Sequence, residues 1–329
     1  MPTAPIDSLE RLGQTWALDV PTERKRMLII VNPYATTVSQ RLKNLVVSAL
    51  QGRYEVTAVE TKGRNHATEL CREARAEGYD VVVAFGGDGT VNEAANGLAG
   101  GDVPLTCLPG GATNVYCKML GIPGEIVDAT EHLLRMADDW QPRRADLARV
   151  NGRHFAFSSG IGLDASVVER VDRHPYRKAK FGAWYFTLAA ITTFLGRYVT
   201  KPPRLCVELP DGRSLDGVTA IVQNGDPFTY FRNRPIHLAK GGQIDNGSLS
   251  GLVLRRSTPT VMPTIIWRAF SKRAEVTHHR AVDGFDGLDE LTIRSTDGRA
   301  IPLQVDGDHI GDVTEASYGI AAHALPVIS

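Results

Sequence analysis

Apolar and polar residues alternate along the first part of the chain in blocks that predict strands and helices in turn. The expected strands are short runs at 27–31, 54–59, 81–85 and 104–108, and the run at 81–85 consists of apolar, mostly β-branched residues. The expected helices carry apolar residues at helical spacing and lie at 42–49, 66–77, 91–98 and 115–120. Strands that alternate with helices in this way predict a parallel sheet with right-handed crossovers.

From about residue 140 the pattern changes to short strand-like segments separated by Asn-Gly and Asp-Gly turns. The expected strands are residues 145–150, 154–158, 204–209, 218–222, 249–254, 288–295 and 301–305. Helices are expected at 181–196 and near 260–270. The first is shorter than the roughly 20 apolar residues of a bilayer span, so we expect a buried or interfacial helix.

This pattern predicts an α/β N-terminal domain followed by a β-rich sandwich domain. We expect a polar lead-in at residues 1–22, an α/β domain at 23–143, and the β-rich domain from residue 144.

Two glycine-rich turns follow neighbouring strands of the predicted parallel sheet. The first, Gly86-Gly87-Asp88-Gly89-Thr90, leads into the helix that carries Val91, and residues 109–114 form the second. Such turns can direct backbone N–H groups and the positive end of a helix dipole toward an anion. The pattern therefore favours phosphate binding. The alternative for Asp88 is a turn-forming or helix-capping carboxylate.

Charge and cysteine content narrow the class of protein. Of 329 residues, 37 are Lys or Arg and 37 are Asp or Glu, so the formal net charge is zero, which argues against a nucleic-acid binder. The four cysteines show no C-x-x-C spacing, and no secretory signal is visible. We expect buried free thiols and a cytoplasmic location.

Five motifs occur in the order found in a known family: residues 86–93, 108–114, 160–165, 244–247 and 305–308. With them the chain resembles the diacylglycerol kinase catalytic-domain family, most of all its bacterial soluble lipid kinases, and is similar to sphingosine and ceramide kinases. The Gly-Asp-Gly turn alone would also fit NAD kinases and phosphofructokinases. The extension Val91-Asn92-Glu93 and the later motifs favour lipid kinases.

The resemblance implies a cleft between a nucleotide domain and a sandwich domain at 144–314, with residues 315–329 returning to the first domain. It implies ATP binding by Asn32, Thr61, Gly86, Gly87, Asp88, Gly89, Thr90, Val91, Asn92, Gly111 and Thr113. Asp306 and Asp308 fall at the catalytic centre together with Asp88, which would also hold Mg²⁺ with ATP. Asp164 matches an acid on the substrate side, although it could instead cap a helix that starts at Ala165.

Four residues depart from the family pattern. Ala35 stands where a glycine is usual, and Ala112 replaces a common threonine of the second turn. Asn246 replaces an aspartate of a structural magnesium site, and a neutral amide is a poorer ligand for this cation. Asp308 is one methylene shorter than the usual glutamate, so the roles of Asp306 and Asp308 stay undivided.

These observations predict an ATP- and Mg²⁺-dependent kinase that phosphorylates diacylglycerol or a related lipid alcohol. A kinase for a soluble acceptor such as NAD and a non-catalytic lipid- or nucleotide-binding regulator are the alternatives. The aromatic and arginine residues of segment 226–234 suit a lipid headgroup interface or a packed loop. Basic residues that could attract anionic lipid, or form a solvated face, are Arg170, Arg173, Arg177, Lys178 and Lys180. We expect transient contact with the inner face of the membrane, and a homodimer remains open.

Overall fold

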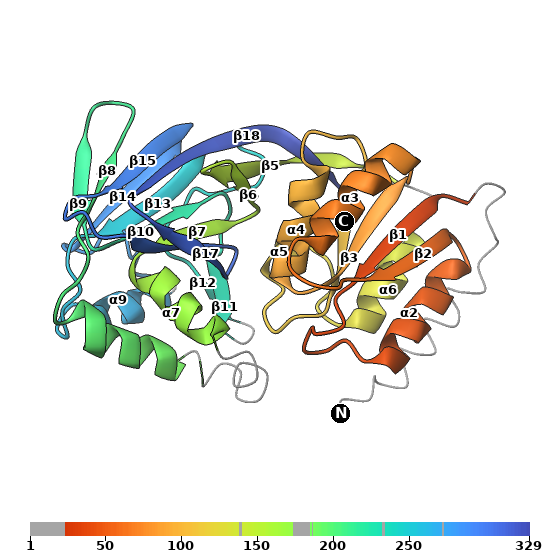
Figure 1. Ribbon diagram of the computed structural model, residues 1–329, viewed down its shortest axis with the longest axis horizontal. Helices are drawn as coiled ribbons and strands as arrows, with labels where there is room; N and C mark the ends of the chain where they lie inside the picture. The colour runs from red at the N-terminus through yellow and green to blue at the C-terminus, as the bar shows by residue number, and fades with distance from the viewer. Residues whose placement is uncertain (1–23, 138–139, 174–184, 186, 232–233, 272) are drawn as a thin grey trace. The chain divides into compact units, whose positions relative to one another are not determined.

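The computed structural model describes residues 24–137, 140–173, 185, 187–231, 234–271 and 273–329 (Figure 1). The described residues fall into two compact units. Unit 1 comprises those up to Ala145 together with His323–Ser329, and unit 2 comprises those of Asp146–Ala322. The predicted lead-in at 1–22 lies outside the described residues.

Unit 1 is built on a parallel sheet in the order β2-β1-β3-β4. These strands are β1 (Arg26–Val31), β2 (Glu55–Glu60), β3 (Val81–Gly86) and β4 (Leu105–Pro109). Every residue of β3 and β4 is buried, as expected for central strands with both faces covered. The last strand of the chain, β18 (Glu315–Val327), reaches this sheet at its C-terminal end, where Val327 pairs in parallel with Leu105.

Helices cover the sheet of unit 1, with α2 packed against α6 and α3 against α4 (Figure 1). They are α2 (Gln40–Gln51), α3 (His66–Glu77), α4 (Asp88–Leu98), α5 (Val115–Met119) and α6 (Ile126–Arg135). Helix α6 was not predicted, although it buries apolar residues on one face. Leu45 of α2 is 37% exposed, whereas Val46 and Ala49 are buried.

Unit 2 packs two antiparallel sheets around one apolar core. The first joins β18 to β15, β8 and β9 in that order, with β5 and β6 beside β18, and the second runs β14-β13-β10-β7-β16-β17. Side chains from both sheets, among them Phe155, Val222 and Ile293, share one core. The predicted fold class, an α/β domain followed by a β-rich sandwich, is therefore confirmed.

The strands of the first sheet besides β18 are β5 (Arg143–Val150), β6 (Arg153–Phe155), β8 (Leu205–Glu208), β9 (Ser214–Gly217) and β15 (Glu290–Ser295). Those of the second are β7 (Ser158–Ile161), β10 (Thr219–Gln223), β13 (Leu249–Leu254), β14 (Val282–Leu288), β16 (Ile301–Val305) and β17 (Asp308–Val313). The segment predicted as one strand at 288–295 is divided between β14 and β15. Strands β17 and β18 were not predicted.

Three helical segments and a small hairpin complete unit 2. They are α7 (Leu163–Asp172), residues 187–193 continuing into the π-helix η1 (Phe194–Tyr198), α9 (Met262–Ala269), and β11 (Thr229–Phe231) paired with β12 (Arg234–Ile236). Among the residues that the structure describes, none of the helices combines the length and apolar character needed to cross a bilayer.

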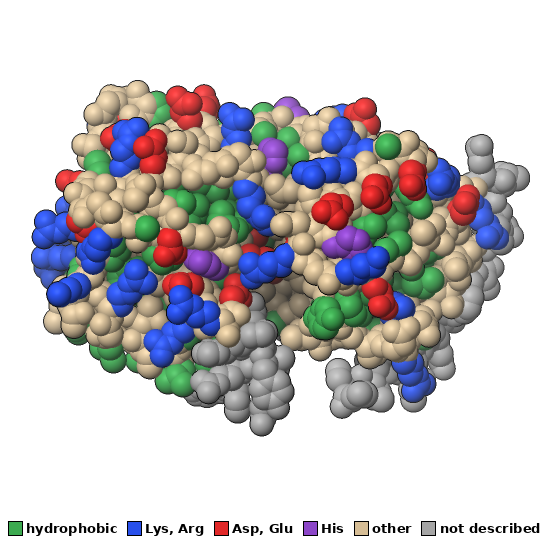
Figure 2. Space-filling model, in the orientation of Figure 1, with side chains coloured by type: hydrophobic (Ala, Val, Ile, Leu, Met, Phe, Trp, Pro, Cys, Tyr) green, Lys and Arg blue, Asp and Glu red, His purple; other side chains and the backbone are tan. Residues whose placement is uncertain are grey.

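Charged side chains of both signs are interspersed over the face shown in Figure 2, in keeping with the zero net charge. The four cysteines are free thiols. Cys71, Cys107 and Cys117 are buried, and Cys206 is partly exposed. The thiol state therefore agrees with the prediction.

Candidate functional site

The two glycine turns of unit 1 lie backbone to backbone. The amide of Gly110 donates to the carbonyl of Gly86 at 2.8 Å, and a Cβ on Gly111 would come within 2.7 Å of the Cα of Gly87. No side chain fits at this contact without moving one turn away from the other. The first turn ends in α4, whose opening amides have no acceptor within the helix. Main-chain donors of both turns therefore collect at the carboxyl ends of β3 and β4.

The loop that follows β1 closes over the same edge of the sheet. The Asn32 backbone N–H donates to Phe85 O at 2.9 Å, and its side-chain amide donates to Thr90 Oγ1 at 3.1 Å. Thr37 N donates to Gly110 O at 3.2 Å, which ties the loop to the second turn. Thr61, at the end of β2, is buried and donates its amide to Val31 O. Neighbouring parallel strands thus bring the predicted nucleotide-binding residues to one edge.

Asp88 joins the first turn to the helix that follows the second. Its carboxylate accepts hydrogen bonds from Thr113 Oγ1 and from the amide of Tyr116, each at 3.1 Å. Asn114, the residue before α5, gives that helix no side-chain cap, so Asp88 takes this role from another element. Burial raises the pKa of Asp88 above its usual value, while the surrounding donors and the Lys118 ammonium oppose the rise. The capping alternative stated for Asp88 is realised here, although the helix that it caps is α5, and Asp88 as a whole residue is partly exposed.

Several motif residues form hydrogen bonds or pack within the turns and the adjoining helices. Asn114, at a positive φ of 48°, closes the second turn because its side chain exchanges hydrogen bonds of 2.8 Å with Gly111 N and O. Glu93 accepts from the amides of Asn65 and Ala67 and so caps α3. Asn92 is buried in α4. The sequence argument named no site role for Asn114, although an asparagine at a turn tolerates this backbone conformation.

In unit 2, Asp306 holds the turn between β16 and β17. Its buried carboxylate accepts from three successive amides, those of Ala156, Phe157 and Ser158, at 2.7 to 3.1 Å. Its own amide donates to Ser158 O at 2.8 Å. A carboxylate committed to three main-chain donors anchors β16 to the β6–β7 connection. Asp308, two residues later, opens β17 and is partly exposed.

Asp164 is connected to the same turn through a buried glutamine that sequence reasoning missed. Gln304 Nε2 donates to Asp164 Oδ2 at 2.7 Å, and Gln304 Oε1 accepts from the amide of Gly307 at 2.9 Å. Gly160 leaves the space for Asp164, since a Cβ there would lie 2.3 Å from Asp164 Oδ2. Burial raises the pKa of Asp164 to about 6, and the Gln304 donor opposes this rise.

Asp164 does not cap α7. The helix begins at Leu163 after Gly162, so Asp164 lies within the first turn. The alternative that Asp164 caps a helix starting at Ala165 was therefore wrong. Asp164, Gln304 and the Asp306–Asp308 turn form one hydrogen-bonded group within unit 2.

Asn246, the doubtful magnesium ligand, closes its own loop. Its side-chain nitrogen donates to Gly241 O at 2.8 Å, and its oxygen accepts from Ser248 N at 3.1 Å. The buried Asp146 accepts a hydrogen bond from Gly247 N at 2.6 Å. The described side chains thus supply this loop with internal hydrogen bonds, and magnesium here stays a prediction.

The segment at 226–234 forms most of a hairpin in which Phe231 packs edge-to-face against Phe270 at 5.7 Å between ring centroids. Arg232 and Asn233 lie outside the described residues. Of the basic residues considered for lipid contact, Arg177, Lys178 and Lys180 also lie outside the described residues. Arg170 and Arg173 are exposed, and Arg173 pairs with Glu169 one turn away on α7.

The part of the chain that holds both glycine turns is similar to a known protein family. Residues 26–150 match the model of the diacylglycerol kinase catalytic domain. Diacylglycerol kinase of Bacillus subtilis (strain 168) is 34% identical over 145 residues, which cover 42% of this chain and 46% of that protein. Diacylglycerol kinase of Staphylococcus aureus (strain JH9) is 32% identical over 138 residues, or 40% and 42% of the two chains. The resemblance inferred from the motifs is thereby confirmed, although the chain spans less than half the length of these relatives.

Similarity in structure extends further along the chain than similarity in sequence. The crystal structure of a diacylglycerol kinase from Bacillus anthracis str. Sterne has a TM-score of 0.68, and the match covers 94% of this chain and 98% of that one. The two are 20% identical, so this likeness establishes the fold.

Proposed function

We propose that the protein is an ATP-dependent lipid kinase that transfers the γ-phosphate to the hydroxyl of diacylglycerol or a related lipid alcohol. The observation that carries this proposal is the contact of two glycine turns beside Asp88, inside the segment that matches the diacylglycerol kinase catalytic domain. Phosphoryl transfer depends mainly on positioning and on stabilising charge, and main-chain amides at strand ends supply both.

The nucleotide is proposed to bind along the edge formed by Asn32, Thr61 and the two turns. Amides of residues 87–89 and of residues 112 and 113 donate to phosphate oxygens. Gly111 lets the second turn approach the first, and Thr90, Val91 and Asn92 continue α4 after the first turn. Because Gly86 and Gly87 have no Cβ, a phosphate can approach the main chain of the first turn closely. Asn32 supports this arrangement through its hydrogen bond to Thr90.

A magnesium ion fits the chemistry of Asp88. The Asp88 carboxylate accepts hydrogen bonds from Thr113 Oγ1 and the Tyr116 amide, its two oxygens offer about four lone-pair sites, and carboxylate oxygen is a preferred ligand of Mg²⁺. The ion would neutralise charge on the transferred phosphate when bound with ATP. The Asp88 side chain meanwhile keeps the first turn and α5 in a fixed relation.

The acidic group of unit 2 is proposed to serve the acceptor. Asp308 accepts the proton of the lipid hydroxyl as its oxygen bonds to the γ-phosphorus and the bond to ADP breaks. Asp306 positions the turn that carries Asp308, because its own carboxylate is held by three amides. Asp164 orients the substrate from α7 and is linked to the turn through Gln304.

Two exposed apolar stripes of unit 2 support contact with a lipid surface. Leu188, Ile191 and Leu195 are 58, 51 and 54% exposed and recur at helical spacing. On α9, Ile266 and Trp267 are 52 and 63% exposed. A tryptophan beside aliphatic side chains suits the boundary between headgroups and acyl chains. The described part of the predicted helix at 181–196 therefore presents an apolar face outward, in the manner of an interfacial helix.

The test is transfer of labelled phosphate from ATP to diacylglycerol in mixed micelles, with NAD in the same buffer as the soluble acceptor. We expect labelled lipid, no labelled NAD, and transfer by the Asp308→Asn protein that is slower by at least about 10². Labelled NAD without labelled lipid would replace the proposal by the soluble-acceptor kinase. ATP binding without transfer to either acceptor would favour the non-catalytic regulator.

A further inference from the structure

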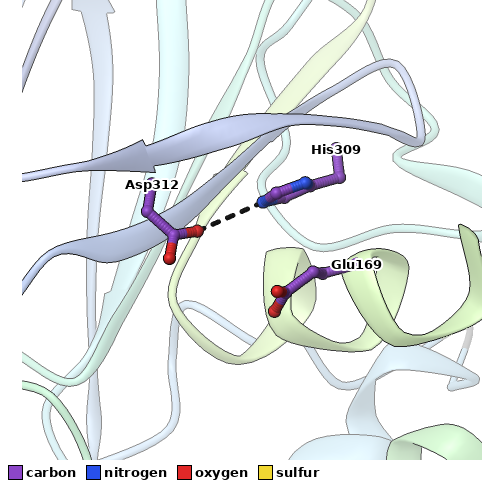
Figure 3. A group of neighbouring side chains, drawn as sticks. All are labelled: Glu169, His309 and Asp312. Carbon is purple, nitrogen blue, oxygen red and sulfur yellow. Dashed lines mark hydrogen bonds and ion pairs between the residues drawn. The ribbon is translucent and has the colours of Figure 1, made fainter. Parts of the chain in front are cut away.

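A histidine and two carboxylates from α7 and β17 converge on one point of unit 2 (Figure 3). His309 and Asp312 lie on β17, and Glu169 reaches toward them from α7. One ligand atom of each lies within 4.8 Å of the others. Within the described part of the chain this is the one group of three or more His, Cys, Asp or Glu side chains arranged in this way. The sequence alone had suggested no ligand role for His309.

A β-bulge brings the two β17 residues to the same face. Residues 309 and 312 are three positions apart, and in a regular strand such residues point to opposite faces. In the β16–β17 pair, Gln304 pairs with His309 and Leu303 with Gly311, so Ile310 is an extra residue on β17. One extra residue shifts the alternation by one, and bulges commonly redirect side chains near functional sites. His309 and Asp312 consequently both face Glu169 (Figure 3).

The spacing of these atoms suits a small divalent cation. His309 Nε2 and Asp312 Oδ1 are 3.2 Å apart. Ligands of a tetrahedral zinc ion with bonds of about 2.0–2.1 Å are roughly 3.3–3.4 Å apart, so this pair needs almost no rearrangement. Glu169 is paired with the exposed Arg173, and an exposed ion pair of this kind is weak enough to exchange its partner for a metal. The Glu169 and His309 side chains are only 17 and 23% exposed, which restricts their rotation.

We propose that Glu169, His309 and Asp312 bind a divalent transition-metal ion of the zinc type. Imidazole nitrogen favours zinc over magnesium or calcium, which prefer oxygen ligands. Three protein ligands would leave a coordination position for water, as in open zinc sites. The ion would fasten β17, directly after the turn that carries Asp308, to α7, which carries Asp164. This inference does not depend on the proposed kinase activity.

The test is calorimetric titration of the apo protein with ZnCl₂, repeated with MgCl₂, and Co²⁺ absorption as an independent signature. We expect one zinc site that magnesium does not occupy, and visible Co²⁺ bands without thiolate charge transfer in the near ultraviolet. His309→Gln and Glu169→Gln should each weaken zinc binding at least about tenfold, since even residues that only support a metal ligand are worth 10- to 100-fold in affinity.

His237 supplies a matched control, because it contacts one carboxylate, Asp226, at 2.8 Å and does not belong to a three-ligand group among the described residues. His237→Gln should leave the zinc affinity unchanged, and circular dichroism of each variant verifies folding. The proposal is overturned if the wild type binds no zinc, if His309→Gln binds it as tightly as the wild type, or if Co²⁺ binds with thiolate bands. A kinase assay that fails leaves each of these readouts intact.

Discussion

Replacing Asp164 by asparagine should make the protein more stable at neutral and alkaline pH. Burial raises the pKa of this carboxyl from 3.8 to about 6, so the native state disfavours its charged form. A shift of about two units, at about 1.4 kcal/mol per unit, corresponds to on the order of 3 kcal/mol. The asparagine is nearly isosteric, and its Oδ1 can still accept from Gln304 Nε2. Because Asp164 is partly exposed, we expect a gain of about 1–3 kcal/mol in the free energy of unfolding.

The sign of the pH dependence follows from proton binding. Between about pH 4 and pH 6 the native state binds more protons at Asp164 than the unfolded state, so the wild type loses stability as pH rises through this window. Above it, the full penalty for the charged carboxylate remains. Asp164→Asn should therefore equal the wild type near pH 4, gain progressively to pH 6, and keep a constant advantage beyond it.

Urea unfolding at pH 4.5 and pH 8 measures this difference directly. Asp289→Asn, at an exposed position of unit 2, is the control and should show no pH-dependent gain. An Asp164→Asn protein that is equally or less stable than the wild type at pH 8 would refute the reasoning. The same variant should lose lipid-kinase activity while remaining folded, because Asp164 is proposed to orient the substrate.

The remaining predictions separate the roles of neighbouring residues. Asp306→Ala should lower the free energy of unfolding by about 3–5 kcal/mol, because three buried amides lose their acceptor. Asp308→Asn should leave the melting temperature nearly unchanged and lower kcat by about 10²–10⁴. Equal thermal stability of the two variants would contradict this division of roles. Gly111→Ala should weaken ATP binding at least about tenfold in calorimetry, because the added Cβ forces the two turns apart. At Gly124 a Cβ would meet no atom within 4 Å, so Gly124→Ala should bind ATP as the wild type does. Equal ATP affinities of the two variants would argue against the paired turns. Trp267→Ala should reduce co-sedimentation with anionic vesicles several-fold, because it removes a large side chain from the proposed lipid surface. Leu45→Ala, outside that surface, should not reduce it. Unchanged vesicle binding by the Trp267 variant would exclude α9 from the lipid surface.

Local patterns were sufficient to predict the framework of unit 1. The buried run of β3, the glycine turn and the helical spacing after Val91 are each encoded by consecutive residues, and α3 occupies the predicted residues 66–77. Helix α6 was not predicted, although it buries apolar residues on one face. In unit 2, Gly-containing turns marked the hairpins, but β17 is short, bulged and partly exposed throughout, so it carries no clear alternation.

Side-chain roles were harder to predict because their partners are distant in sequence. Asp88 caps α5 from 28 residues away, and Asp306 holds amides about 150 residues earlier in the chain. Gln304 lies in an apolar strand pattern, and nothing in its immediate neighbours indicates that it bridges Asp164 to the turn. A motif identifies such residues as a set, whereas their division into anchoring and reacting groups requires the contacts themselves.

A crystal structure of the protein with ATP and Mg²⁺ tests the central claim most directly. The account predicts phosphate oxygens within hydrogen-bonding distance, about 2.7–3.2 Å, of main-chain amides at residues 87–89 and at residues 112 and 113 of the second turn. A triphosphate bound at another edge of the parallel sheet, or in unit 2 alone, would contradict it.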